Sequence, residues 1–111
     1  MGNITTHVLD AARGRPAAGV PVLLERRTGD AWQRLANGLT DHDGRCGDLT
    51  RGSVAPGMHR LVFDTGAYFS ASGQPTFYPE VGVTFDVPDV DQHYHVPLLL
   101  SPFSYTTYRG S

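Results

Sequence analysis

Glycine and proline divide this chain into short segments, and this punctuation restricts the fold more than any other feature of the sequence. The 111 residues contain 13 Gly and 8 Pro. Most segments between them are rich in β-branched residues or alternate apolar with polar ones, which is typical of short strands. Such a series predicts two packed antiparallel sheets. Because a chain of this length supports one core, we expect residues 1–111 to form a single domain.

The expected strands number eight: residues 4–9, 20–27, 31–39, a short strand beginning near Arg45, 59–64, 81–87, 93–100 and 103–108. The Asp43-Gly44 pair predicts the tight turn before the fourth strand, because these residues tolerate positive φ. Residues 13–16 are expected to form a turn. Residues 67–72 lie between two glycines and are the one place where a helical turn competes with a strand. The prediction is therefore an all-β, eight-stranded antiparallel β-sandwich with one short helix.

The basic residues exclude several kinds of function. All nine are Arg, and without Lys the chain cannot use Schiff-base chemistry or a lysine-containing phosphate loop. The Arg residues are scattered and the formal net charge is −2, so no basic stripe is available to a phosphate backbone. Nucleic acid is not an expected partner.

Cysteine content and hydropathy bear on the expected location. The single Cys46 cannot form an internal disulfide, and the first residues lack the basic patch and apolar run of a signal peptide. The longest apolar run, residues 96–100, is far shorter than the roughly 20 residues that span a bilayer. We therefore expect a cytoplasmic protein with no membrane partner.

Strand alternation directs two histidines away from the expected core. Residues 93–100 place four apolar side chains on one face, so His95 points outward from the other. The same count over residues 4–9 turns His7 outward. Tyr108, in the last strand, can join them on one external face if the three strands are neighbours.

The external face of one small sandwich is too flat to hold a substrate, because small-molecule sites are usually concave. A second subunit would have to cover this face, so we expect an oligomer with its site at a symmetric interface. Pro97 lacks an N–H and belongs at an edge or a bulge, and a distortion there can re-aim His95.

Each histidine also has a simpler interpretation. A lone His in a strand is more often a structural or surface residue. His93 and His95 alternate as a metal-binding pair does, but without an evident third ligand we expect no metal. His42 and His59 are expected to be structural.

Arg45, Cys46 and the last eight residues also have a functional and a structural interpretation. Arg45, directly after the hairpin, is either a solvated edge charge or a fork of donors for a substrate carbonyl or anionic ring. Cys46 is expected to be a small, partly buried residue and not a nucleophile. Residues 104–111 are dense in hydrogen-bonding groups, which indicates that this end of the chain is held against the protein.

Four stretches together resemble one known family. They are Thr6-His7-Val8-Leu9-Asp10, Asp41-His42-Asp43-Gly44-Arg45, residues 93–102 (His-Tyr-His-Val-Pro-Leu-Leu-Leu-Ser-Pro) and the terminal Tyr108-Arg109-Gly110-Ser111. With them the chain, from Ile4 to Ser111, resembles the 5-hydroxyisourate hydrolases, the transthyretin-related proteins of purine breakdown. The closing Tyr-Arg-Gly-Ser is the most specific element, because it distinguishes the hydrolases from the thyroid-hormone carrier transthyretin.

The resemblance implies a homotetramer, a dimer of dimers, with its sites in a channel between dimers. It implies His7, Arg45 and His95 as catalytic residues, Tyr108 and Ser111 as substrate-binding residues, and no metal or cofactor. The implied substrate is 5-hydroxyisourate, and the product of ring opening is 2-oxo-4-hydroxy-4-carboxy-5-ureidoimidazoline.

These residue types suit the opening of a cyclic amide by water. The reaction needs a base for the water, a donor or cation for the developing oxyanion, and a proton for the departing nitrogen. One of the two histidines would take the water proton and the other would orient the water or return a proton, with Arg45 on the substrate oxygens. Which histidine is the base stays open. The alternatives are a transthyretin-like carrier of a small ligand without catalysis, and an interaction module in which these residues only form an interface.

Overall fold

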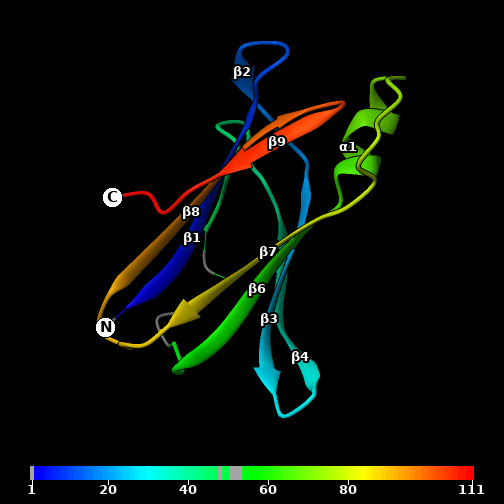
Figure 1. The fold of residues 1–111 in the computed structure, drawn as a ribbon. Coiled ribbons are helices and arrows are strands. Elements are labelled where there is room, and N and C mark those ends of the chain that lie inside the picture. The colour runs from blue at the N-terminus through cyan, green and yellow to red at the C-terminus, as the bar shows by residue number, and fades with distance from the viewer. Residues whose placement is uncertain (1, 48, 51–53) are drawn as a thin grey trace.

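Two sheets pack face to face in the computed structural model, which describes residues 2–47, 49–50 and 54–111 (Figure 1). The elements are β1 (Asn3–Asp10), β2 (Arg15–Pro16), β3 (Pro21–Thr28), β4 (Ala31–Leu39), β5 (Arg45–Cys46), β6 (Gly57–Phe63), α1 (Thr65–Ala71), β7 (Val81–Val87), β8 (His93–Ser101) and β9 (Ser104–Thr107). The predicted all-β sandwich with one short helix is confirmed. The eight predicted strands are found, and residues 15–16 of the predicted turn form an additional two-residue strand, β2.

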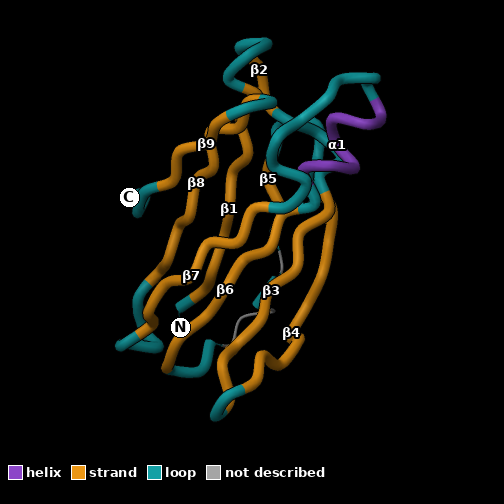
Figure 2. The backbone as a smooth tube through the Cα atoms, turned by 45° about the vertical axis from the view of Figure 1, so that its right-hand side comes forward, coloured by secondary structure: helices purple, strands orange, loops and turns teal. Residues whose placement is uncertain are grey.

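The strand order separates the two layers (Figure 2). One sheet has the order β2-β1-β8-β9, with β5 also paired to β1, and the other has the order β4-β3-β6-β7. All pairings but one are antiparallel, as predicted. The exception is central: β1 and β8 run parallel over eight residue pairs, from Asn3 opposite His93 to Asp10 opposite Leu100. This pairing joins the two ends of the sequence and positions the histidines.

The core forms as the alternation predicts. Along β1 every second residue from Ile4 onward is buried, so His7 and its neighbour Thr5 lie on the outer face. In β8, Tyr94, Val96, Leu98 and Leu100 are buried, and His95 is partly exposed. Burying these apolar side chains supplies the main driving force for folding and fixes which face of the sheet carries the polar residues.

Of the two predicted places for Pro97, a sheet edge or a local distortion, the edge is wrong, because β8 lies between β1 and β9. The pairing with the C-terminal segment is instead interrupted at this point. Leu98 pairs with Thr107, and the next bridge joins His95 to Gly110. A proline has no N–H for the ladder, so the interruption accommodates it.

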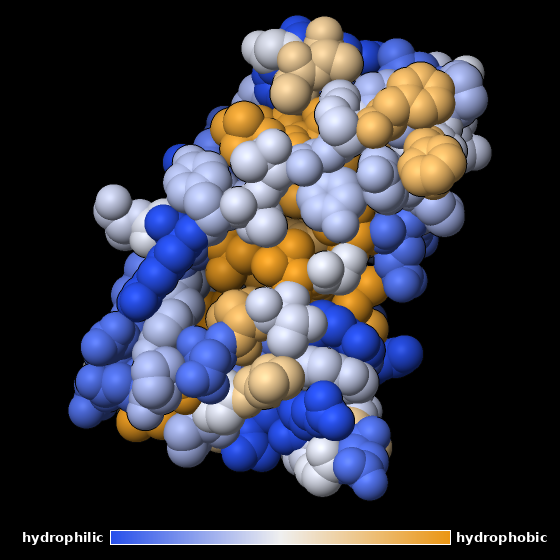
Figure 3. Space-filling view, viewed as in Figure 1, coloured by the Kyte–Doolittle hydropathy of each residue, from blue (hydrophilic) through white to orange (hydrophobic). Residues whose placement is uncertain are grey.

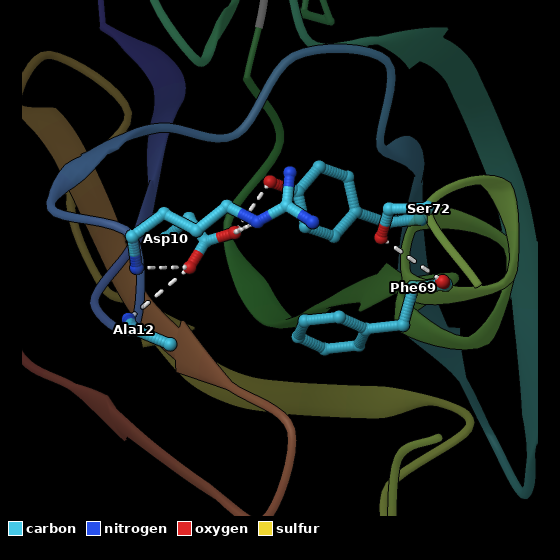
Figure 4. Close-up of polar contacts among 6 residues, drawn as sticks. Asp10, Ala12, Phe69 and Ser72 are labelled. Carbon is cyan, nitrogen blue, oxygen red and sulfur yellow. Dashed lines mark hydrogen bonds and ion pairs between the residues drawn. The ribbon is translucent and has the colours of Figure 1, made fainter. Parts of the chain in front are cut away.

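The short helix α1 lies at one end of the sandwich and is tied to it by polar contacts (Figures 1 and 4). Its first turn is capped by Asp64, whose carboxylate accepts from the Ala67 N–H at 3.0 Å. The Tyr68 hydroxyl donates to the buried Asp10 carboxylate at 2.6 Å, and Asp10 also accepts from the Ala12 N–H. No helix in the described residues is long and apolar enough to cross a membrane.

Candidate active site

The outer face of β1 and β8 brings together four of the five predicted site residues, His7, Arg45, His95 and Ser111, from distant parts of the sequence. In the parallel pairing, Thr5 lies opposite His95. On the other side of β1, His7 lies opposite Arg45 of the short strand β5. The Asp43-Gly44 hairpin therefore places Arg45 beside the histidines, although it is remote from His95 in the sequence.

A shallow groove of about 310 Å³ lies on this face. Its lining combines imidazole, guanidinium and hydroxyl groups from β1, β5, β8 and the C-terminus: Thr5, Thr6, Arg45, Cys46, Gly47, His93, His95 and Ser111. Three of the five predicted site residues, Arg45, His95 and Ser111, line it directly. Such a set can bind a polar, oxygen-rich molecule and exchange protons with it.

His95 is held and kept neutral by its surroundings. Its Nδ1 lies 2.9 Å from the Thr5 hydroxyl oxygen. Burial lowers the pKa of His95, and electrostatic interactions with Arg45, His93 and His7 lower it further. The imidazole is therefore an available base near neutral pH.

His7 is fixed by the hairpin that carries Arg45. Its Nε2 donates to the Asp43 carbonyl oxygen at 2.8 Å, because a carbonyl can only accept. The Asp41 carboxylate accepts from the N–H groups of Asp43 and Arg45, at 2.9 and 3.0 Å. These backbone bonds, chiefly that from Arg45, lower the pKa of Asp41. Gly44 adopts a φ of 78°, which this turn requires.

The C-terminal residues are held against β8, as their composition predicts. The Gly110 N–H donates to the His95 carbonyl oxygen at 2.8 Å. The Arg109 guanidinium lies over the Tyr94 ring and donates to the Gln92 side chain at 3.0 Å. A β-carbon at Gly110 would come within 2.5 Å of the His95 ring. This glycine therefore lets the terminus pass close to the imidazole and brings Ser111 into the groove.

Tyr108 does not line this groove. It lies in a separate, mainly apolar hollow of about 240 Å³ between β7 and β8, on the other side of His95, with Val83 and Phe85 among its neighbours. Figure 3, viewed as in Figure 1, shows apolar surface gathered in the middle of the side of the molecule that it displays. Tyr108 falls between the last β8–β9 pair, Leu98 with Thr107, and the bridge of His95 to Gly110, so no described pair includes it.

The remaining histidines divide as follows. His59 is buried, its ring stacks on Phe85 and its Nδ1 donates to the Gly57 carbonyl, so its structural role is confirmed. His42 is exposed, with its Nε2 3.5 Å from the Asp43 carboxylate. His93 stacks on His95, with 6.3 Å between ring centroids.

In the described part of the chain, the cluster of three or more ligand residues that could hold a metal ion is Asp41, His42 and Asp43, all exposed. The absence of a metal from the site stays a prediction.

The residue that sequence reasoning missed is Thr5. Its signal was present, because Thr5 shares the outward face of its strand with His7.

Comparison with known proteins agrees with this architecture. The family model "HIUase/Transthyretin family" matches residues 4–110. The 5-hydroxyisourate hydrolase of Pseudomonas aeruginosa is 46% identical over 117 residues, which cover 100% of this chain and 93% of that protein.

Two solved structures show the same fold. The 5-hydroxyisourate hydrolase of Klebsiella pneumoniae matches with a TM-score of 0.90 and 33% identity, over 100% of both chains. Sea bream transthyretin in complex with thyroxine matches with a TM-score of 0.89 and 37% identity, over 96% of this chain and 93% of that chain. The similarity of fold therefore extends both to a hydrolase and to a transthyretin in complex with thyroxine.

Proposed function

Since the chain belongs to the HIUase/Transthyretin family, we propose that it is a hydrolase that opens the ring of 5-hydroxyisourate with water, in the breakdown of urate. The product is 2-oxo-4-hydroxy-4-carboxy-5-ureidoimidazoline. A relative that bears the name of this hydrolase is 46% identical over the whole of this chain. The observation that carries the proposal is the groove, in which His95, with its lowered pKa, lies beside Arg45.

His95 is the better candidate for the general base. Its Nε2 has no hydrogen-bond partner among the described residues, whereas the Nε2 of His7 donates to a carbonyl. In the proposed reaction His95 Nε2 removes a proton from water, and the water oxygen attacks the ring carbonyl carbon. The Arg45 guanidinium stabilises the oxyanion, because its donors match the developing charge.

The ring C–N bond then breaks, and the proton held by His95 passes to the departing nitrogen. His7, anchored by the hairpin, orients the attacking water, and Ser111 contacts the substrate. The described chain supplies a base, a cation and proton donors for these steps, so the proposal includes no metal, cofactor or covalent intermediate. Tyr108 stays a predicted substrate-binding residue, since it lines the neighbouring hollow.

The second candidate function is a carrier of a small ligand without catalysis. The match to the thyroxine-bound transthyretin favours it, because that protein has nearly the same TM-score as the hydrolase from Klebsiella pneumoniae. The polarity of the groove argues against it. A largely apolar ligand gains little from an imidazole and a guanidinium at its contact surface.

We also propose that the chain assembles into a homotetramer, a dimer of dimers. The groove is open on the outer face of a sheet, and a second copy over it would make the site concave. Large apolar side chains stay exposed on the described surface, among them Phe77 at 70%, Phe103 at 67% and Tyr108 at 56%. Light scattering should give four times the 12.0 kDa of one chain. A cytoplasmic location stays a prediction.

The decisive experiment generates 5-hydroxyisourate in situ from urate and follows its ultraviolet absorbance with and without the protein. The expected result is a decay faster than the spontaneous reaction at micromolar protein. Equal decay rates together with tight ligand binding would instead support the carrier.

The same assay assigns the residues. His95→Asn and Arg45→Lys should each lower kcat by about 100-fold or more, which is typical of losing a general base or an oxyanion donor. His7→Asn should also lower it. A fully active His95→Asn variant would remove His95 from the mechanism.

A further inference from the structure

Three hydrogen bonds connect side chains across the outer face of β1 and β8, and they end at the proposed base. Asn3 Oδ1 contacts His93 Nδ1, in a contact shorter than an ordinary hydrogen bond. His93 Nε2 lies 3.3 Å from the Thr5 hydroxyl oxygen, and that oxygen lies 2.9 Å from His95 Nδ1. The chain of contacts thus alternates between the two strands that pair in parallel.

The donors in this chain can be assigned from its outer end. With Asn3 turned so that its Oδ1 faces His93, His93 Nδ1 carries the shared proton, because an amide oxygen only accepts. Neutral His93 then has an unprotonated Nε2, which accepts from the Thr5 hydroxyl. A hydroxyl has one proton, so the Thr5 oxygen is left to accept from His95 Nδ1. His95 must therefore be protonated on Nδ1.

We propose that Asn3, His93 and Thr5 are positioning residues that fix the tautomer of His95, so that its Nε2 carries a lone pair directed to the substrate. The inference rests on the proposed function, in which Nε2 takes the water proton. A backbone carbonyl or a carboxylate often fixes a histidine in this way. Here two neutral side chains and a second histidine do so.

The arrangement suits a base that must gain and lose one proton in each turnover. When Nε2 takes the proton from water, His95 becomes an imidazolium and its Nδ1–H bond to Thr5 persists. No other proton in the chain has to move. A wrong tautomer would present an N–H to the water, and in the serine proteases disturbing the tautomer of the catalytic histidine lowers kcat severely.

The first test reads the tautomer without any substrate. In ¹⁵N spectra of histidine-labelled protein near neutral pH, His95 should show a protonated Nδ1 and an unprotonated Nε2. The His95→Asn variant identifies its signals among the five histidines. A resting His95 protonated on Nε2 would overturn the proposal, whatever the protein does to 5-hydroxyisourate.

The second test removes the hydroxyl at the centre of the chain. Thr5→Val keeps the branched shape of the side chain in its strand, and we expect kcat to fall about 10- to 100-fold with KM little changed, the usual size of losing an orienting partner. Its ¹⁵N spectrum should show a mixture of His95 tautomers. Thr5→Ser retains the hydroxyl and should restore both measurements.

Thr28→Val is the matched control, because Thr28 is an exposed strand residue at the β3–β4 hairpin, outside the groove. It should leave kcat unchanged. If the wild-type protein turns over 5-hydroxyisourate and Thr5→Val matches it in kcat and tautomer, the positioning role is wrong and the function stands. If the wild-type protein has no activity, the function fails, and the tautomer still reports on the chain of hydrogen bonds.

Discussion

Strand β1 contributes a residue to each of two polar clusters, one around Asp10 and one around Thr5 and His95. The clusters differ in whether all their hydrogen-bonding groups have a partner. Asp10, at the end of the strand, faces inward and is 1% exposed. Its carboxylate accepts hydrogen bonds from the Tyr68 hydroxyl and from the N–H groups of Ala12 and Arg13. Thr5, on the opposite face, orients His95, whose Nε2 has no partner among the described residues.

The difference separates stability from chemistry. An inward-facing carboxylate must be fully hydrogen-bonded, because an unpaired buried charge is costly. The polar groups that line the groove are partly exposed to water. The imidazole nitrogen and the guanidinium there can therefore lack a protein partner without the free-energy cost of an unpaired buried charge. A one-residue step along the strand changes the face and therefore the role of a polar side chain. Variants can perturb each cluster separately.

The largest expected effect comes from crowding the groove and leaving the Asp10 cluster untouched. In Gly110→Ala the new β-carbon would lie 2.5 Å from the His95 ring, so the ring must shift. Because a displacement of about 1 Å can cost about 100-fold, we expect kcat to fall by that order while the free energy of unfolding changes little. Stopped-flow turnover and urea denaturation measure the two quantities.

Gly82→Ala is the control for this substitution. Its β-carbon would meet Arg60 at 3.7 Å, an ordinary contact, so kcat should keep its wild-type value. A Gly110→Ala protein that is fully active would show that the close approach of the terminus does not position His95.

The outward face of this groove was predictable from sequence, because alternation along a strand is a local rule. It identified His7 and His95 as outward residues, and the Asp43-Gly44 turn identified the hairpin before Arg45. The pairing of Thr5 with His95 was not predictable in the same way. Register between strands from opposite ends of the chain is set by the packing of the whole core.

Long-range pairing also accounts for the parallel strands and for the position of Tyr108, which the sequence did not predict. The parallel pairing of β1 with β8 joins strands that are remote in sequence, so no turn signal announces it. Tyr108 lies in the interruption of the ladder near Pro97, and its neighbours in the hollow come from β7, which is remote in the sequence. Local patterns predicted the elements and their faces, and long-range pairing decided which residues meet.

The next largest effect should come from removing one hydrogen-bond donor from the Asp10 cluster. Tyr68→Phe removes the 2.6 Å hydrogen bond to Asp10, and burial together with this bond raises the pKa of Tyr68 to about 12. We expect the free energy of unfolding to fall by about 1.5–3 kcal/mol, the range for hydrogen bonds to charged groups. Turnover should be unchanged, since this contact lies outside the groove.

The matched control is Tyr78→Phe, which removes a hydroxyl with no hydrogen-bond partner in the part of the chain that the structure describes. Urea denaturation should separate the two variants clearly. Equal stability of Tyr68→Phe and Tyr78→Phe would mean that the Asp10 cluster contributes nothing measurable.

The smallest expected effect is on the pH dependence of stability. It compares His59, in the core, with His95, in the groove. Burial lowers the pKa of His59, so below about pH 6.5 the unfolded chain binds a proton that the folded chain does not. The free energy of unfolding should therefore fall as the pH decreases from 6.5, by at most about 1.4 kcal/mol per pH unit for this group. His95, with its pKa also lowered, contributes with the same sign.

Measuring denaturation between pH 7 and pH 5 separates the two histidines. His59→Gln should flatten part of this acid slope and leave turnover near neutral pH unchanged, because His59 lies in the core and outside the groove. His95→Asn should flatten the slope as well and abolish most turnover. His42→Gln, at a side chain that is 89% exposed, controls for the loss of a histidine as such. If His59→Gln keeps the full wild-type slope, acid sensitivity arises from the groove and not from the closed interior.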